Sequence, residues 1–573
     1  MPAPQPAAAH DLGHASVADV VVIGGGVNGT GVARDLSLRG LRVVLFEKND
    51  LAFGASGNSS GMIHGGARYL AYDASVTAKS CKDSGFIQAV APHLLFRIPF
   101  LMPLPRGAKG RILLELVDAY FKAYDDYQPL KRGESHTRLS AAEMQAVEPG
   151  LATDSCGGVT FDEWGTDGAR LCTLNAVDAA RNGAAVHVHT EVERIEPIGQ
   201  SDAAASQSPA IPRWLVTARD ATSGAVHRVA CAFVVNATGA WGPLTAALGD
   251  VARASLNVRP GKGIHVYYER RITNFAIVAK AIDGRQAFLE PWENMTVIGT
   301  TDDDYYGNLD RVLPTSEEAR YLIQAVAQVF PSIRRARAIG TWAGVRPTIH
   351  RWGRVEDKLS REHEIVDHAA AGMRGVISLI GGKLASYRLF AEEASDLVAH
   401  ALGVSRPCQT HVLPLPGGIS VPNPRQLAEE FSVDSIAAQR LVFRHGERAR
   451  PILQSLRDDP RNAEVVCPCE PVLGAEIRHV LREEFAFTAR DVSRRTRLGL
   501  GACGGMRCAL RCGQIVASER GLSPVEGMRQ GLELLETQAL MRRPILDGEQ
   551  AQQEALHRAY LRGLLGPSPG EGS

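Results

Sequence analysis

The sequence predicts an α/β fold in which a Rossmann-like domain carries an inserted antiparallel sheet and precedes a mainly helical C-terminal region. Three observations lead to this fold class. A strand, a glycine turn and a helix follow one another from residue 19; two strand-rich blocks occupy residues 185–237 and 258–301; and a Pro- and Gly-rich stretch at 403–424 precedes helical sequence with clustered cysteines. A chain of 573 residues is too long for one compact core, so several domains are expected.

The N-terminal part of the chain has the pattern of one βαβ unit. The run DVVVI at 19–23 is a short β-branched strand, apolar enough to be buried on both faces. Val32 and Leu36 then give the apolar stripe of a helix, and Gly40 ends it. Residues 42–46 (RVVLF) form the next strand, which we expect to be parallel to the first.

The turn inside this unit predicts a dinucleotide site. Gly24, Gly26 and Gly29 have the spacing GxGxxG, which permits a tight turn and lets backbone N–H groups approach a pyrophosphate at the positive end of a helix. Glu47 ends the second strand, where a carboxylate can accept both ribose hydroxyls. A glycine-rich turn without a ligand is the alternative.

Distant segments favour FAD over a nicotinamide dinucleotide, because FAD is extended and needs remote sequence to reach its flavin ring. The segment NATGAW, with Ala237 and Gly239, closes a three-stranded meander. The segment IGGK, with Gly381 and Gly382, ends a late strand. Both fit a fold in which the first Rossmann unit is completed by sequence far along the chain.

The remaining elements are expected from periodicity and from turn residues. They are a mainly helical region at 69–146 with a loop at 99–107, a hairpin loop at 200–212, a helix at 316–329, a loop at 344–347, a strand at 375–380 and helices over 425–455.

Five of the ten cysteines fall between Cys467 and Cys512, which favours metal or cluster ligation over disulfides in a chain without an export signal. Cys467 and Cys469 form CxC, and Cys503 and Cys508 form CxxxxC. Two close pairs of thiolates suit a 2Fe-2S cluster, whereas four cysteines would also build a tetrahedral zinc site. Cys512 is an extra thiol, either a substitute ligand or an inert helical residue.

Composition excludes several classes of protein. Hydrophobic residues make up 45% and charged residues 22%, which is typical of a globular chain. The net charge is zero, so no global field favours nucleic acid or an anionic membrane, and an anionic substrate needs a local cluster of cations. Residues 1–18 lack the features of a secretory signal, and no long apolar run predicts a transmembrane segment. We expect a cytoplasmic protein, with peripheral contact at the inner face of the cytoplasmic membrane left open.

These motifs, and others in the same order, resemble those of the FAD-dependent glycerol-3-phosphate dehydrogenases. The resemblance covers roughly residues 19–397. Its segments are DVVVIGGGVNGTGVARDLSLRGLRVVLFEKNDLAFGAS at 19–56, HGGARYL at 64–70, NATGAW at 236–241, IGTTDDDY at 298–305, GVRP at 344–347 and GGKLASYR at 381–388. It implies the FAD fold of the D-amino-acid-oxidase type with an inserted substrate domain. It also implies oxidation of sn-glycerol 3-phosphate to dihydroxyacetone phosphate by hydride transfer to FAD.

The resemblance also implies the substrate pocket. Arg68 and Arg346 match family positions that line it, and a guanidinium can grip phosphate bidentately where lysine is only a point charge. Arg361 and Lys383 match further positions at the same pocket. His64 is a candidate for positioning the reacting hydroxyl or the flavin.

Other residues keep open alternatives. Lys383 or Arg346 could stabilise the alkoxide as it forms, which makes both catalytic candidates beside His64. Ser56, Ser59 and Ser60 match family serines near the FAD pyrophosphate and ring, with a plain polar loop as the alternative. The acidic tract DDDYY at 302–306 invites a metal interpretation, but a strand-ending acidic turn is favoured because this chemistry needs no divalent ion.

The cysteine segments VCPCEPV at 466–472 and RRTRLGLGAC at 494–503 resemble the bacterioferritin-associated-ferredoxin-like domain of the anaerobic large subunit. This resemblance implies that electrons pass from FAD through a 2Fe-2S cluster to companion subunits and to quinone. Gly61 agrees with the anaerobic form because the aerobic enzymes tend to place a lysine nearby. Residues 92–105 look closer to the aerobic form.

We therefore expect six segments along the chain. They are a disordered leader at 1–18, an FAD-dependent oxidoreductase domain at 19–402, a linker at 403–424, a helical connector at 425–461, a 2Fe-2S domain at 462–516 and a helical tail with a disordered end at 517–573. Two other functions stay open: an FAD oxidoreductase of another small hydroxy or amino acid, and a noncatalytic flavin and iron-sulfur module for electron transfer.

Overall fold

The computed structural model describes residues 16–67, 70–71, 74–198, 212–249, 256–350 and 363–563. Arg68 and Arg361 lie outside the described residues, as do most of the expected leader and of the expected hairpin loop at 200–212. The first βαβ unit is confirmed, with β1 at Ser16–Ile23, α1 at Val27–Leu38 and β2 at Val43–Phe46. Because β1 begins at Ser16, the last three residues of the expected leader belong to the strand.

The first sheet, the nucleotide sheet, has the strand order β17-β18-β10-β1-β2-β7, with β8 and β9 continuing from β10. Its further strands are β7 (Ala185–His187), β8 (Thr190–Pro197), β9 (Trp214–Asp220), β10 (Val226–Asn236), β17 (His363–Asp367) and β18 (Val376–Gly381). Strands β10 and β18 run parallel to β1, so their carboxyl ends meet the glycine turn at one edge. Helices α1, α5 (Gly168–Arg181) and α9 (Tyr387–Ala401) pack together beside this sheet.

The second sheet, the substrate sheet, has the order β15-β11-β14-β13-β12-β4-β6-β3, with β16 on β11 and β5 on β6. Its strands are β3 (Met62–Ile63), β4 (Leu95–Pro105), β5 (Thr137–Ser140), β6 (Ser155–Thr166), β11 (Val258–Tyr268), β12 (Ala276–Lys280), β13 (Gln286–Trp292), β14 (Met295–Gly299), β15 (Asp303–Asp304) and β16 (Ala338–Ile349). Helix α8 (Ser316–Val329) packs on β11 to β14, and α3 (Ala108–Tyr124) packs on β4 and β6. Helices α2 (Ala74–Val90) and α4 (Ala141–Val147) complete this part.

Two expected loops are wrong. Residues 99–107 mostly belong to β4, which pairs with β6 along its whole length. Pro99 and Pro103 stand an even number of residues apart, so their missing N–H groups face the same side of β4, and the register with β6 is regular until it shifts between Leu104 and Pro105. The segment 344–347 lies inside β16, which among the described strands pairs with β11 alone; a proline is tolerated in such an edge strand.

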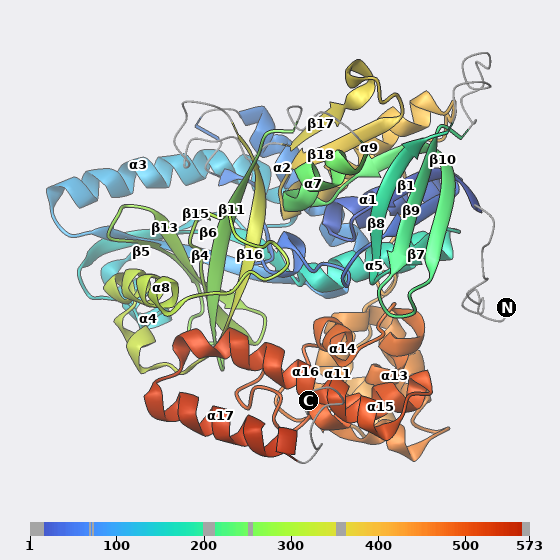
Figure 1. Cartoon of the computed structure of the whole chain (residues 1–573). Coiled ribbons are helices and arrows are strands. Elements are labelled where there is room, and N and C mark those ends of the chain that lie inside the picture. The colour runs from blue at the N-terminus through green and yellow to red at the C-terminus, as the bar shows by residue number, and fades with distance from the viewer. Residues whose placement is uncertain are drawn as a thin grey trace.

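The C-terminal region is mainly helical, as expected. Its elements are α10 (Pro424–Phe431), α11 (Ser435–His445), α12 (Ala449–Gln454), β19 (Val465–Cys467), β20 (Val472–Leu473), α13 (Gly474–Glu483), α14 (Ala489–Thr496), α15 (Ala509–Arg520), α16 (Pro524–Arg542) and α17 (Gly548–Gly563). In Figure 1 it lies beneath both sheets. Helix α15 continues past residue 516, so the expected boundary there falls within a helix. Among the described residues no helix is long and apolar enough to cross a membrane.

Buried ion pairs join the C-terminal region to the nucleotide sheet and its helices. Arg495 contacts Asp50 through two hydrogen bonds of 2.7 and 2.5 Å, and Asp50 lies in the loop that follows β2. Arg170 of α5 pairs with Glu484, and both side chains are fully buried. Breaking such a pair would leave a buried charge without its partner, which favours one fixed arrangement of the two regions.

Candidate active site

A cavity of about 1020 Å³ lies between the carboxyl edge of the nucleotide sheet and one face of the substrate sheet. Pockets for small ligands usually measure about 300–1,000 Å³, so this one has room for a dinucleotide together with a small substrate. The expected site residues that line it are Gly24, Gly26, Glu47, Ser56, Ser59, Ser60, His64, Ala237, Gly239, Arg346, Gly381, Gly382 and Lys383. One cavity therefore brings together segments that lie more than 350 residues apart in the sequence.

The glycine turn allows a close approach of the backbone to this cavity. Gly24 has φ of +109°, and a Cβ there would lie 2.7 Å from the Ala237 carbonyl oxygen. A Cβ on Gly29 would lie 2.0 Å from the Gly24 carbonyl oxygen, so Gly29 seats α1 against the turn although it does not line the cavity. Gly26 precedes α1 and has no side chain to cap it. The first helical N–H, that of Val27, donates to Ser56 Oγ at 3.0 Å, so the N–H groups that follow it are the ones that could bind a phosphate.

Glu47 is held in place by the backbone. The N–H of Gly25 donates to Glu47 Oε2 at 2.7 Å, and the N–H of Asn49 donates to Oε1 at 2.8 Å. Burial raises the pKa of Glu47, while these two hydrogen bonds oppose that rise. The second lone pair of each oxygen is left for the ribose hydroxyls of a dinucleotide.

Replacing Glu47 with glutamine is expected to raise the Kd for FAD about 10- to 100-fold. The amide has one acceptor oxygen, so it cannot accept from both N–H groups and from a ribose. Fluorescence titration of the deflavinated variant measures this change. Glu193→Gln, in the exposed ion pair with Arg219 on the same sheet, serves as the control. Equal affinity in Glu47→Gln and the control would contradict the assignment of Glu47.

Arg346 projects from β16 into the cavity and is fixed along one side. Its NH2 donates to Thr300 Oγ1 at 2.9 Å, and its NH1 donates to the Thr301 carbonyl at 3.2 Å and to Asp302 Oδ1 at 3.3 Å. A Cβ on Gly263 would lie 2.5 Å from Arg346 NH2, so the neighbouring strand leaves room for the guanidinium. This orientation suits bidentate recognition of an anion.

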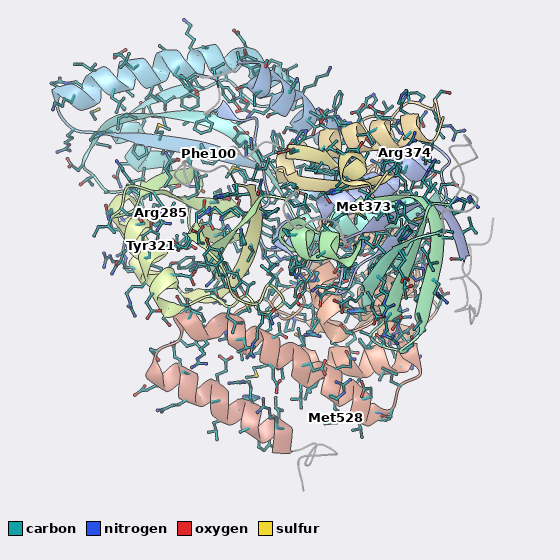
Figure 2. All side chains as sticks on the ribbon, turned by 45° about the horizontal axis from the view of Figure 1, so that its top comes forward. Phe100, Arg285, Tyr321, Met373, Arg374 and Met528 are labelled. Atoms are coloured by element: carbon teal, nitrogen blue, oxygen red, sulfur yellow. The ribbon has the colours of Figure 1, made fainter. Side chains whose placement is uncertain are left out.

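A second arginine of the cavity wall, Arg285, lies close to Tyr321, as Figure 2 shows, with its guanidinium 5.4 Å from the ring centre. It also pairs with Asp303 at 2.9 Å. The carboxylates of the acidic tract are thus engaged by arginines, Asp302 with Arg346 and Asp303 with Arg285. This arrangement supports the acidic turn over a metal site.

Sequence reasoning missed two buried groups of the cavity, His265 on β11 and Glu290 on β13. Burial lowers the pKa of His265 to about 3 and raises the pKa of Glu290 to about 8. Among the described residues, neither His265 Nδ1 nor Glu290 Oε2 has a hydrogen-bond partner. A signal was present for Glu290, since it is the only charged residue in the otherwise apolar run AFLEPW at 287–292.

The raised pKa of Glu290 predicts a pH-dependent stability. Between its ordinary value of 4.5 and about 8, the folded protein retains a proton that the unfolded chain has released, so this group's contribution to stability falls as pH rises. Glu290→Gln removes the effect. The Tm of this variant relative to wild type should rise from pH 5 to about pH 8 and then level off; the corresponding difference in the free energy of unfolding is about 5 kcal/mol at most. Thermal unfolding of both proteins across this range tests it; a constant difference in Tm would contradict it.

The four expected ligand cysteines form two pairs. Cys469 Sγ lies 3.6 Å from Cys503 Sγ. Cys508 hydrogen-bonds Cys467, and this bond is the largest cause that lowers the pKa of Cys467 to about 6. Cys512 follows Cys508 by one turn of α15, and burial raises its pKa.

No three of these sulfur atoms lie within 4.8 Å of one another. Across the part of the chain that the structure describes, the only such triad of possible ligands is His445, His479 and Glu484. Arg448 already occupies that triad, since it hydrogen-bonds His479 at 2.7 Å and pairs with Glu484 at 3.0 Å. A single zinc ion would draw all four sulfurs to similar distances from one another. Two pairs fit two iron ions with two thiolates each.

Together the fold and the cavity define a flavin-dependent oxidoreductase, and comparison with known proteins agrees. The family of FAD dependent oxidoreductases matches residues 19–388, and the C-terminal domain of alpha-glycerophosphate oxidase matches 408–526. The crystal structure of glycerol-3-phosphate dehydrogenase from Bacillus halodurans, complexed with FAD, is similar with a TM-score of 0.73 and 25% identity over 92% of this chain and 96% of that one.

Curated relatives narrow the class. The chain is 29% identical to a subunit of the anaerobic glycerol-3-phosphate dehydrogenase of Escherichia coli K12, over 96% of this chain and 97% of that protein. It is 32% identical to a subunit of the enzyme of the same name from Haloferax volcanii, over 87% of this chain and 83% of that protein. The chain belongs to the family of FAD-dependent glycerol-3-phosphate dehydrogenases.

Proposed function

We propose that the chain oxidises sn-glycerol 3-phosphate to dihydroxyacetone phosphate at FAD, and that the electrons leave through a 2Fe-2S cluster toward a partner and quinone. One observation carries the first half of this proposal: the dinucleotide turn, Arg346 and Lys383 line the same cavity. The relatives are named glycerol-3-phosphate dehydrogenases, which supports glycerol 3-phosphate as the substrate. The paired cysteines carry the second half.

Each side chain has a proposed part in the reaction. Bound FAD supplies the hydride acceptor. Arg346 grips the phosphate, because its guanidinium is oriented by three oxygen acceptors of the segment 300–302. Lys383 stabilises the alkoxide that forms at C2, and His64 takes up the proton of the C2 hydroxyl. Arg68 and Arg361 match family positions at this pocket, and both lie outside the described residues.

The cysteine arrangement supports the electron path. Reduced FAD holds two electrons and a 2Fe-2S cluster accepts one at a time, so the cluster can pass them on singly. The Escherichia coli relative is named as one subunit of its enzyme, which supports a protein partner as the next acceptor. Such a partner would also account for contact with the membrane at its inner face.

Anaerobic stopped-flow absorbance tests the reaction and separates it from its alternatives. Protein with bound FAD is mixed in turn with glycerol 3-phosphate, glycerol and glycine. The proposal predicts rapid bleaching of the flavin with glycerol 3-phosphate alone. Bleaching by glycine instead would favour an amino-acid oxidoreductase, and no bleaching by any of the three would favour a noncatalytic module.

A further inference from the structure

Three aromatic rings are stacked in series on one face of the substrate sheet. His265 lines the cavity and stacks on Trp342, with ring centres 5.4 Å apart and planes 27° apart. Trp342 stacks in turn on Tyr267, at 5.1 Å and 29°. His265 and Tyr267 share a face of β11 because they are two residues apart, and Trp342 lies opposite His265 on β16. The stack therefore begins at the cavity and leads away from it.

The far end of the stack meets the cysteine domain. Tyr267 belongs to a buried cluster with Trp292, and both Trp342 and Ala502 pack against this cluster. Ala502 immediately precedes Cys503 in the sequence. The cluster of Tyr267 and Trp292 in the substrate sheet therefore connects the ring stack, through Ala502, to the loop that carries Cys503, a proposed iron ligand.

Trp292 gives a second connection between the same two places. Its Nε1 donates to the Ser60 carbonyl at 2.8 Å, and Ser60 lines the cavity. The Arg497 guanidinium lies 4.7 Å from the centre of the Trp292 ring. Arg497 also contacts Glu470 at 3.3 Å, next to Cys469. Trp292 is 7% exposed and Tyr267 is 2% exposed, so both rings are shielded from water, whereas Trp342 is half-buried.

We propose that Trp342, Tyr267 and Trp292 form the route by which electrons pass from the flavin cavity to the cysteine pairs. This inference rests on the proposed 2Fe-2S cluster. Electron tunnelling weakens steeply across gaps and less steeply through packed, conjugated groups. The ring stack and the cluster of Tyr267 and Trp292 supply such groups between the cavity and Ala502. The four cysteines would hold the cluster, which would accept one electron at a time and pass it to the partner before the second arrives. The flavin protons would go to solvent, and the rings would undergo no net change of oxidation state.

The test separates flavin reduction from cluster reduction. Trp342→Met and Tyr267→Met fill the core without a ring, whereas Trp342→Phe and Tyr267→Phe keep one. Each variant is mixed anaerobically with glycerol 3-phosphate, and flavin bleaching is followed by absorbance while freeze-quench electron paramagnetic resonance follows the reduced cluster. Trp214→Met, at a buried tryptophan of β9 in the other sheet, is the control.

We expect the methionine variants of Trp342 and Tyr267 to bleach at the wild-type rate and to reduce the cluster about tenfold more slowly, with the phenylalanine variants close to wild type. If a methionine variant loses FAD or iron, the same comparison is made with Trp292→Phe and Trp292→Met. Equal rates of cluster reduction in the methionine and phenylalanine variants would overturn the route alone. A wild-type protein without iron and without a cluster signal would overturn the proposed cluster, and the route with it.

Discussion

Replacing Arg346 with lysine is expected to lower kcat/KM for glycerol 3-phosphate by about 10²- to 10³-fold. The guanidinium offers two parallel N–H donors to a phosphate, and its orientation is set by Thr300, Thr301 and Asp302. Lysine keeps the charge but loses the planar fork, so it cannot bind these acceptors and a phosphate bidentately at the same time. The rate of flavin bleaching at increasing substrate concentration measures the loss.

Arg259→Lys is the matched control for this variant. Arg259 lies on the neighbouring strand β11 and pairs with the same Asp302, but it does not line the cavity. Its replacement changes the same type of residue in the same ion network, so it should leave kcat/KM within a few-fold of wild type once FAD content is matched. Equal losses in the two variants would assign the effect to the network and not to substrate binding.

Replacing Cys503 with serine should abolish electron transfer to a quinone analogue while flavin bleaching by glycerol 3-phosphate persists. Cys503 shares one cysteine pair with Cys469, so its loss leaves one iron of the cluster with a single thiolate. The iron content of the variant should be near zero, compared with about two iron atoms per chain in the wild-type protein. Zinc in the wild-type protein, or unchanged quinone reduction in the variant, would contradict the cluster.

Cys512→Ala provides the comparison within the same domain. Cys512 is fully buried among apolar side chains of the C-terminal core, one helical turn from Cys508. The variant should retain iron and quinone reduction, with only a modest loss of stability from the smaller side chain. Loss of iron in this variant would instead make Cys512 a ligand.

Local signals predicted much of the fold. The helix expected at 316–329 begins and ends where the structure has α8, because Thr315 and Glu318 form a capping box before an amphipathic run. The strand, turn and helix around Gly24 were equally predictable, since each depends on neighbours in the sequence. Glycine spacing was informative for the same reason. The cysteine pairs of the structure, Cys469 with Cys503 and Cys467 with Cys508, each join the CxC motif to the CxxxxC motif across more than 30 residues of sequence.

Long-range pairing explains what sequence reasoning missed. Strands β4 and β16 contain prolines that suggest loops, and only their partners β6 and β11 make them strands. The pKa values of Glu290 and His265 are shifted because the fold buries both side chains in the cavity wall. No local sequence pattern predicts that burial. The contact of Arg497 with Trp292 likewise joins regions about 200 residues apart.

A reductive titration with glycerol 3-phosphate under anaerobic conditions tests the central claim most directly. Absorbance measures the redox state of the flavin, and electron paramagnetic resonance measures that of the cluster. The amount of dihydroxyacetone phosphate formed gives the number of electrons delivered. The account predicts that both centres are reduced and that the chain takes up about three electrons, two at FAD and one at the cluster. A flavin that stays oxidised in excess substrate would contradict it.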